Sequence, residues 1–186
     1  SDLKEVLKLL RSTLPSNIQI RQNFSCPSDV VHADPTQIYQ VLMNLCTNAA
    51  HAMREEGGIL EVTLEPEHIP NLHINYAYNL TQGNYLKLTV RDNGCGMEAS
   101  TIEHIFEPFF TTKKEGEGTG LGLSVVYGIV KDHGGAIHIA SQPDKGTTFT
   151  ILLPLIEEEV THRKAAASPI PEGRGRILVV DDEEAL

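Results

Sequence analysis

Two glycine clusters frame the stretch that organises this chain: Asp92-Asn93-Gly94-Cys95-Gly96-Met97 and Gly118-Thr119-Gly120-Leu121-Gly122-Leu123. Between them lies an aromatic segment that ends in threonines and lysines, Ile105-Phe106-Glu107-Pro108-Phe109-Phe110-Thr111-Thr112-Lys113-Lys114. Glycine has no Cβ and lets a backbone approach a ligand closely, and free N–H groups at a helix start favour phosphate. The stretch is therefore interpreted as a nucleotide site with its own lid.

The composition fits one globular domain with some tail. The chain has 186 residues, of which 40% are hydrophobic and 22% charged, and this is enough to bury a core without disulfides. The formal net charge of −10 argues against a nucleic-acid partner, because phosphate contacts along nucleic acid need clustered Lys and Arg. An anionic ligand would need local compensation of this charge.

The three cysteines, Cys26, Cys46 and Cys95, are far apart and form no Cys-x-x-Cys pair. They favour a reducing compartment, disfavour structural zinc and are interpreted as small buried hydrophobes. The sequence contains no signal peptide and no apolar run of about 18 residues. We therefore expect a cytoplasmic location, and a membrane anchor in a longer parent stays open.

Hydrophobic periodicity predicts helices and strands that follow one another along the chain. A capping acid and a first-turn proline begin one helix at Asp34-Pro35, and Gly134-Gly135 ends another. The segment 65–84 contains Pro66, Pro70 and Gly83 and has no clear periodicity, so it is interpreted as an extended hairpin connection. The predicted helices span 2–14, 34–54 and 121–133, and the predicted strands span 17–24, 59–64, 85–90, 136–141 and 147–153.

This element order predicts a mixed, mostly antiparallel sheet that is covered on one face by about three helices. The fold class is thus a two-layer sandwich of the α/β or α+β kind. The helix over 2–14 belongs either to the core of this domain or to the end of a longer upstream helix, and the sequence leaves both possibilities open.

The helix over 34–54 carries Asn44, Asn48 and His51 on one stripe, because spacings of four and three residues return to nearly the same direction. Its apolar face is predicted to be Ile38, Leu42, Leu45, Ala49 and Met53. Taken alone, the polar stripe favours a solvated surface. Together with the glycine clusters, it favours a ligand-binding face.

Asp92 follows a predicted strand and directly precedes a glycine turn. A carboxylate there accepts a hydrogen bond from the exocyclic amine of adenine and repels the carbonyl that guanine places at that position. Gly94 and Gly96 let the ring lie against backbone, and Met97 can pack on its face. An isolated Asp-x-Gly-x-Gly is more typical of an ordinary turn.

The second glycine cluster opens a helix, so its free N–H groups and positive end can hold phosphates. Its spacing fits neither the P-loop nor the dinucleotide fingerprint. Lys113, Lys114 and Thr119 can supply charge and a hydroxyl to a terminal phosphate. The Mg²⁺ that accompanies ATP takes few protein ligands, for which the amide oxygen of Asn48 is suited, while Asn44 can position water or a phosphate.

These motifs, in this order, resemble the N, G1, F and G2 boxes of the ATP-binding catalytic domain of sensor histidine kinases. The matching residues are Asn44-x-x-x-Asn48, Asp92-x-Gly94-x-Gly96, Phe106 to Phe110 and Gly118-x-Gly120-x-Gly122, and Gly146-Thr147-Thr148-Phe149 resembles the final glycine-threonine element. The resemblance covers about 34–154. It implies the sandwich shared with gyrase-type and chaperone ATPases, known as the GHKL fold, with ATP and Mg²⁺ as cofactors.

The resemblance also implies roles for individual residues. Asn48 would bind magnesium, Asp92 would bind adenine, and the residues between the glycine clusters would form a mobile lid over the phosphates. Lys113 is the candidate phosphate contact. The candidate cofactor-binding residues are Asn44, Asn48, His51, Asp92, Gly94, Gly96, Met97, Lys113, Gly118, Thr119, Gly120, Leu121, Gly122 and Thr147.

Details of two motifs resemble the nitrogen-regulatory-sensor branch of these kinases, namely Asn-Ala-x-x-Ala-Met from Asn48 and the Pro-Phe-Phe-Thr-Thr-Lys run from Pro108. The chain departs from many family members at two positions. His51 stands where many have Lys or Arg, and Ala52 stands where many have an aromatic residue.

Histidine kinases transfer the γ-phosphoryl group to a histidine on a separate helical domain, commonly before Glu or Asp. None of the eight histidines here precedes an acid. The resemblance therefore implies a phosphoacceptor upstream of this chain, in a parent that is a homodimer. Residues 1–15 would be the tail of that dimerisation domain, 16–156 the catalytic domain and 157–176 a linker.

The segment 177–186 resembles the first strand and acidic pair of a receiver domain, which implies a hybrid kinase. The expected partners are the phosphoacceptor domain and a receiver domain, in the same protein or in a separate response regulator. Two alternatives stay open. One is a gyrase-like ATPase, which would need a glutamate base where this chain has Asn44. The other is an anti-sigma-type serine kinase or nucleotide-binding regulator.

Overall fold

The computed structural model describes residues 11, 14–25, 35–70, 80–114 and 118–155. The chain divides into two units, 1–156 and 157–186, and every described residue belongs to the first. Most of the predicted helix over 2–14, together with the predicted linker over 157–176 and the receiver-like segment 177–186, lies outside the described residues.

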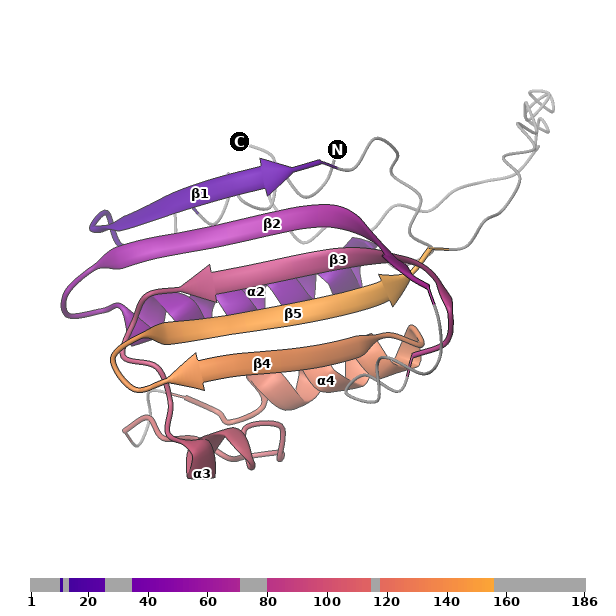
Figure 1. Cartoon of the computed structure of the whole chain (residues 1–186). Coiled ribbons are helices and arrows are strands. Elements are labelled where there is room, and N and C mark those ends of the chain that lie inside the picture. Colours follow the sequence, from indigo (N-terminus) through magenta and orange to yellow (C-terminus); the bar gives the residue numbers. More distant parts are fainter. Residues whose placement is uncertain (1–10, 12–13, 26–34, 71–79, 115–117, 156–186) are drawn as a thin grey trace, which may run out of the picture. The chain divides into compact units, whose positions relative to one another are not determined.

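Within the described ranges, five strands form one mixed sheet in the order β1-β2-β3-β5-β4 (Figure 1). β1 and β2 are parallel, and the other neighbouring pairs are antiparallel. A helix joins the parallel pair, as the crossover between parallel strands requires. The strands are β1 (Ile18–Phe24), β2 (Gly58–Ile69), β3 (Gly83–Asp92), β4 (Ala136–Gln142) and β5 (Gly146–Pro154).

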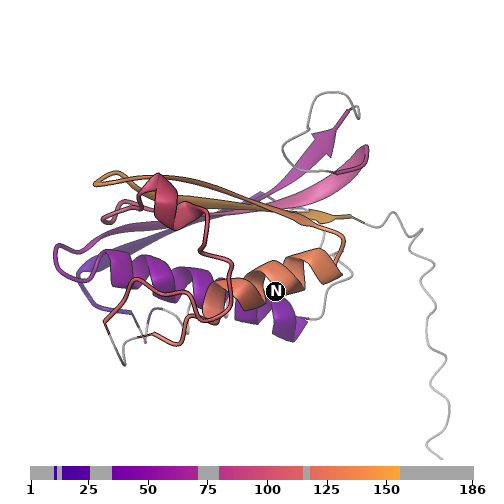
Figure 2. The same cartoon turned by 90° about the horizontal axis from the view of Figure 1, so that it is seen from below.

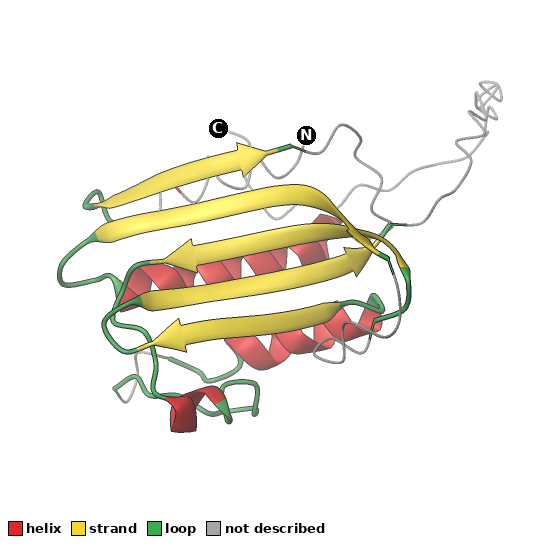
Figure 3. Ribbon diagram, viewed as in Figure 1, coloured by secondary structure: helices red, strands yellow, loops and turns green. Residues whose placement is uncertain are grey.

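Two longer helices, α2 (Pro35–Ala52) and α4 (Gly122–Asp132), lie side by side against one face of this sheet (Figures 1 and 2). The short helix α3 (Ala99–Ile102) lies beside the edge strand β4. Figure 3 shows the sheet as one layer and the two longer helices as the other. The predicted two-layer sandwich is confirmed, and so are the predicted helices that correspond to α2 and α4.

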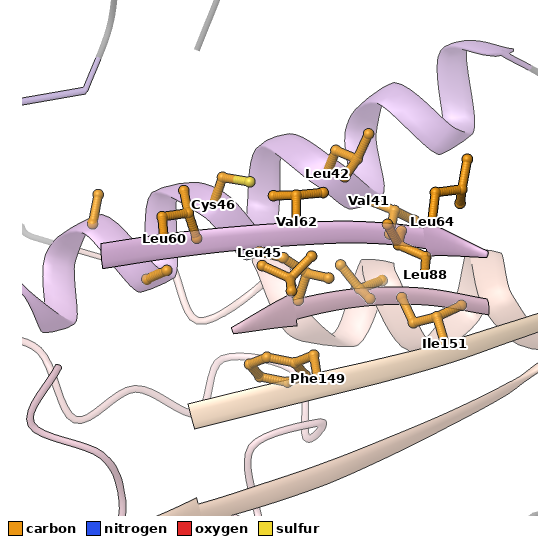
Figure 4. Close-up of a cluster of buried hydrophobic side chains, with 14 of the residues drawn as sticks. Val41, Leu42, Leu45, Cys46, Leu60, Val62, Leu64, Leu88, Phe149 and Ile151 are labelled. Atoms are coloured by element: carbon orange, nitrogen blue, oxygen red, sulfur yellow. The ribbon is translucent and has the colours of Figure 1, made fainter. Parts of the chain in front are cut away.

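The core fills the space between the sheet and the two longer helices (Figure 4). The apolar face predicted for α2 is confirmed, because all its members except the half-buried Ile38 are buried. Each strand contributes alternate residues to this core, as side chains that point to opposite faces of a sheet must do. The sheet residues in the core include Leu60, Val62, Leu64, Leu88, Val90, Phe149 and Ile151.

The predicted hairpin is confirmed, but the connection predicted over 65–84 is too long. β2 continues to Ile69 and β3 begins at Gly83, so the two strands form a long hairpin. Among the described residues, β1 pairs with β2 only as far as Leu64. Beyond that point one side of β2 has no partner strand among the described residues, and the missing N–H of Pro66 is tolerated at such an edge.

Contacts between residues far apart in sequence hold the distal part of this hairpin. Lys87 Nζ lies 3.1 Å from a carboxylate oxygen of Glu65 and 3.5 Å from one of Glu67. Ile69, Tyr85 and Leu152 are buried together in a second, smaller cluster. These pairings join residues that local periodicity in 65–84 does not reveal. No helix in the described ranges is long and apolar enough to cross a membrane.

The first prediction concerns the contact between α2 and the sheet. Leu42 has 0% of its surface exposed, and truncation of a buried leucine leaves a cavity that costs about 2–5 kcal/mol of unfolding free energy. We expect Leu42→Ala to lose stability in this range in urea unfolding. The exposed Gln40→Ala on the same helix should stay within about 0.5 kcal/mol of the parent. Equal losses in the two variants would contradict the assigned faces.

Candidate functional site

A cleft of about 1220 Å³ lies where the end of β3, the start of β5, one stripe of α2 and the start of α4 meet. Every predicted binding residue lines this cleft except Leu121. Leu121 occupies the N-cap position of α4 and is exposed. The structure therefore brings the two glycine clusters and the polar stripe of α2 around one space, as the motif order predicted.

Asp92 is the last residue of β3, and only 5% of its surface is exposed. Its Oδ1 accepts the backbone N–H of Gly94 at 2.9 Å and that of Thr147 at 3.2 Å. In the part of the chain that the structure describes, Oδ2 has no hydrogen-bond partner. No fully buried side-chain oxygen there lacks a partner, so Oδ2 reaches the surface of the cleft.

The surroundings of Asp92 shift the pKa of its carboxyl group. Burial raises the pKa of this carboxyl above its ordinary value, because a charged group loses hydration there. The N–H groups of Gly94 and Thr147 partly offset this effect by stabilising the anion. Oδ1 of Asp92 is fixed by two hydrogen bonds, and Oδ2 is open to the cleft. The carboxylate can therefore accept a hydrogen bond from a donor in the cleft.

The first glycine cluster packs against protein backbone on both sides. Gly96 has φ of +65°, and a Cβ there would collide with the carbonyl of Gln142. The N–H of Cys95 donates to Ala52 O at 3.1 Å, and the N–H of Asp144 donates to Cys95 O at 2.8 Å. This turn thus ties the end of α2 to the turn between β4 and β5, and that packing accounts for Gly96 without a ligand.

The cysteines differ from one another. Cys46 is buried in α2, and burial raises its pKa to about 12, as expected for an inert core thiol. Cys95 is exposed, so its interpretation as a buried hydrophobe is wrong. Both backbone groups of Cys95 are used in the contacts above, and the exposed residue lines the cleft. Cys26 lies outside the described residues.

The aromatic segment and the second glycine cluster are joined directly. The N–H of Phe109 donates to Gly120 O at 3.0 Å. Both residues have left-handed backbone angles, with φ of +68° and +67°, and a Cβ on Gly120 would collide with the backbone of Phe109. Thr119 Oγ1 accepts the N–H of Leu121 at 3.3 Å, just before the start of α4.

The polar stripe of α2 faces this joined region. Asn44 Oδ1 lies 3.1 Å from the position that a Cβ on Gly122 would occupy, so the start of α4 passes close to α2. Asn48 Oδ1 accepts a hydrogen bond from Lys113 Nζ at 3.1 Å. His51 is half-buried and lines the cleft one turn further along. The stripe is a cleft wall and not a solvated surface.

Sequence reasoning missed two residues that shape the cleft. Asn93 Oδ1 accepts the N–H of Ile59 at 2.7 Å and fixes the start of β2 beside the first glycine cluster. Asp144, with φ of +59°, lies in the turn that packs on that cluster. The turn itself was predicted, but no local signal in it indicates which loop it contacts.

The side chains of the cleft can hold a metal ion only if a bound ligand supplies further oxygen atoms. In the described ranges, no group of three or more His, Cys, Asp or Glu is placed to hold a metal ion. The cleft does offer the amide oxygen of Asn48, and magnesium commonly takes one or two protein oxygens beside phosphates and water. The residues present therefore fit a metal that enters with a phosphate ligand.

Fold and cleft together define a two-layer domain with an open acceptor at one end of its cleft and a helix N-terminus at the other, an arrangement suited to a nucleotide. Comparison with known families agrees. Residues 33–157 match the model described as "Histidine kinase-, DNA gyrase B-, and HSP90-like ATPase". The chain belongs to this ATP-binding family.

Relatives narrow the class to the catalytic ATPase domain of sensor histidine kinases. Sensor kinase CckA of Brucella abortus is 40% identical over the whole chain, and sensor histidine kinase ZraS of Escherichia coli is 41% identical over 74% of it. The NtrB histidine kinase/phosphatase of Rhizobium leguminosarum is 35% identical over 90% of the chain. The chain spans only 21%, 26% and 43% of these proteins, respectively.

Solved structures agree with this assignment. The catalytic domain of histidine kinase ThkA superposes with a TM-score of 0.64 at 32% identity, covering 83% of this chain and 90% of that domain. The predicted fold type and the resemblance of about 34–154 to the catalytic domain of sensor histidine kinases are thereby confirmed.

The second prediction tests the environment of Asp92 through stability. A raised folded pKa means that the folded state binds the proton more tightly than the unfolded state, so stability falls as pH rises through that interval. Asp92→Asn keeps an oxygen for the two N–H donors but does not titrate. We expect the unfolding free energy of the parent minus that of the variant to fall from pH 3.8 upward and then level off.

Urea unfolding of both proteins across a pH series measures this difference. A difference that rises with pH would mean that the carboxylate is stabilised in the fold, and it would contradict the assigned environment.

Proposed function

We propose that the cleft binds ATP with Mg²⁺ and presents the γ-phosphoryl group to a histidine on a separate phosphoacceptor domain. The single observation that carries this proposal is the arrangement at Asp92, where two backbone N–H groups fix Oδ1 and Oδ2 opens into the cleft. An oxygen that can only accept selects a donor, and the exocyclic amine of adenine is such a donor.

The adenine end of the cleft excludes guanine by the same chemistry. The carbonyl of guanine would face the carboxylate oxygen, and two acceptors that meet in a buried site are left unpaired. Met97 is half-buried, lines this end of the cleft and supplies an adaptable apolar surface for the ring. The small side chain of Ala52, in the same wall, provides no aromatic stacking.

The phosphate end rests on the start of α4. The first N–H groups of a helix have no intrahelical acceptor and carry partial positive charge, so they bind anions. Lys113 and Thr119 line the same end of the cleft. We assign Lys113 as a contact to the terminal phosphate and Asn44 as a group that positions water or phosphate.

Asn48 is the residue that would hold the metal through its amide oxygen. A magnesium ion held there would help to neutralise the charge of the phosphates. The other groups of the cleft orient the nucleotide and shield it from water. His51, half-buried in the same wall, is a candidate for a further phosphate contact.

The cleft favours presentation of the phosphoryl group over hydrolysis. Asn44 lies beside the start of α4, where the gyrase-like alternative needs a glutamate base, and an amide cannot take a proton from water. We therefore propose that the proton acceptor lies with the receiving histidine on the phosphoacceptor domain.

The partners follow from this division of labour. We propose a homodimeric parent that carries the phosphoacceptor domain in the same protein, with this domain in the cytoplasm and a receiver domain in the same protein or in a separate response regulator. Two observations support this proposal. First, the shared region makes up only 21%, 26% and 43% of the length of the sensor kinases named above. Second, the match to CckA covers the whole chain and therefore includes 177–186.

The third prediction separates the two ends of the cleft. Asp92→Asn should weaken the binding of ATP and also of adenosine at least about tenfold, since a hydrogen bond with a charged group contributes about 1.5–3 kcal/mol. Asn48→Ala should weaken binding only when Mg²⁺ is present. Calorimetry with ATP, GTP and adenosine, with and without Mg²⁺, measures both. Equal affinity of the parent for ATP and GTP would refute the adenine assignment.

The fourth prediction concerns the direction of transfer. With γ-labelled ATP, the chain alone should incorporate little label, because none of its histidines precedes an acid. Addition of the phosphoacceptor domain of the parent protein should move the label onto that domain. The Asp92→Asn chain, assayed in parallel, should transfer much less. Strong labelling of a histidine within this chain would contradict the proposal.

A further inference from the structure

We infer that the ammonium group of Lys113 and a divalent cation compete for one atom, Oδ1 of Asn48. Lys113 would then be an exchangeable cation that links metal binding at α2 to a phosphate contact at the start of α4. This inference rests on the proposed function, in which Asn48 supplies the metal ligand.

The position of Lys113 is set by contacts on several sides. Its Nζ donates to Asn48 Oδ1 at 3.1 Å in a partly buried bond between groups far apart in the sequence. Its backbone N–H donates to Thr111 Oγ1 at 3.1 Å. A Cβ on Gly118 would lie 2.9 Å from Lys113 Cδ. The side chain thus runs through a narrow space that directs its charge at α2.

Charge makes the two partners of Asn48 exclusive. An amide oxygen has two lone pairs, so the hydrogen bond alone would leave room for another partner. A magnesium ion about 2.1 Å from this oxygen would, however, lie within about 5 Å of the ammonium group. Like charges at that separation repel, and partial burial weakens the screening by salt. Lys113 therefore leaves Asn48 when the oxygen binds a divalent cation.

The ammonium group of Lys113 stays near the second glycine cluster after it leaves Asn48. The hydrogen bond to Thr111 Oγ1 and the packing on Gly118 keep the Lys113 backbone beside the second glycine cluster. A nucleotide whose phosphates bind at the start of α4 would place anions beside this cluster. Exchange at Asn48 thereby turns the proposed phosphate contact of Lys113 into a consequence of metal binding.

Removal of Lys113 should affect the response of the protein to Mg²⁺ differently under the two explanations. If Lys113 only held phosphate, its removal would leave the response of the protein to Mg²⁺ unchanged or weaken it. If Lys113 competes at Asn48, its removal frees the oxygen and strengthens that response. ADP is the suitable nucleotide for this test, because it has no γ-phosphate for Lys113 to contact.

The fifth prediction therefore has two readouts on the full chain. In ¹⁵N-labelled protein without nucleotide, Lys113→Met should shift the side-chain amide resonance of Asn48, and Lys113→Arg should shift it less. Lys114→Met removes the same charge from the neighbouring residue and should leave this resonance in place. A shift as large with Lys114→Met as with Lys113→Met overturns the inference.

The second readout is a titration of Mg²⁺ at fixed ADP, followed by the rise in melting temperature. Lys113→Met should respond at about fivefold lower Mg²⁺ than the parent, within the usual range of coupling between two sites, and Lys113→Arg should resemble the parent. An unchanged or higher Mg²⁺ requirement overturns the inference alone. A parent that shows no Mg²⁺-dependent binding of ADP overturns the proposed function and the inference with it.

Discussion

Burial of a carboxylate is costly, and Asp92 offsets part of this cost with hydrogen bonds that draw three segments together. The N–H groups of Gly94 and Thr147 both bind Oδ1, so the first glycine cluster and the start of β5 must meet at the end of β3. That meeting is tight enough that a Cβ on Gly146 would collide with the carbonyl of Asp92. On the far side, the hydroxyls of Ser141 and Thr147 lie 3.0 Å apart and hold β4 to β5. The segments that meet around the carboxylate of Asp92 therefore form the floor of the cleft.

The phosphate end is held differently. Phe109 keeps a left-handed backbone although it is not glycine, and 74% of its surface is exposed, so little packing supports that conformation. One backbone hydrogen bond to Gly120 and the ring of Phe106, 5.0 Å from that of Tyr127, connect the aromatic segment to α4. Fewer buried contacts mean a lower free energy of local opening. The end of the cleft around Asp92 is thus built into the core, whereas Phe109, next to the start of α4, is exposed and held by a backbone hydrogen bond.

Sequence reasoning succeeds where the signal is local and periodic. Spacing alone places α2, α4 and the apolar face of α2, and the order of four motifs is enough to gather Asn44, Asn48 and Asp92 around one cleft. It fails where the decisive contact is distant. Pro66 and Pro70 are typical of a loop. Only the folded hairpin shows that Lys87 and Tyr85 of β3 are partners for the distal part of β2. The contacts of Asn93 and Asp144 could not be predicted for the same reason, since each joins segments whose pairing only the folded sheet determines.

Charge gives these observations a common cause. A chain with a net charge of −10 that binds a polyanion has to supply positive potential without a basic surface. In the proposed function, the start of α4 would do so with backbone dipoles, which add no net charge, and a metal that enters with the ligand would add charge only when it is needed. Lys113, with its ammonium on Asn48, is held at the point where these two sources meet. An acidic domain of this kind could make its affinity for phosphates conditional on a metal, because Lys113, one of its cationic groups at this end of the cleft, is already engaged by Asn48, the proposed metal ligand.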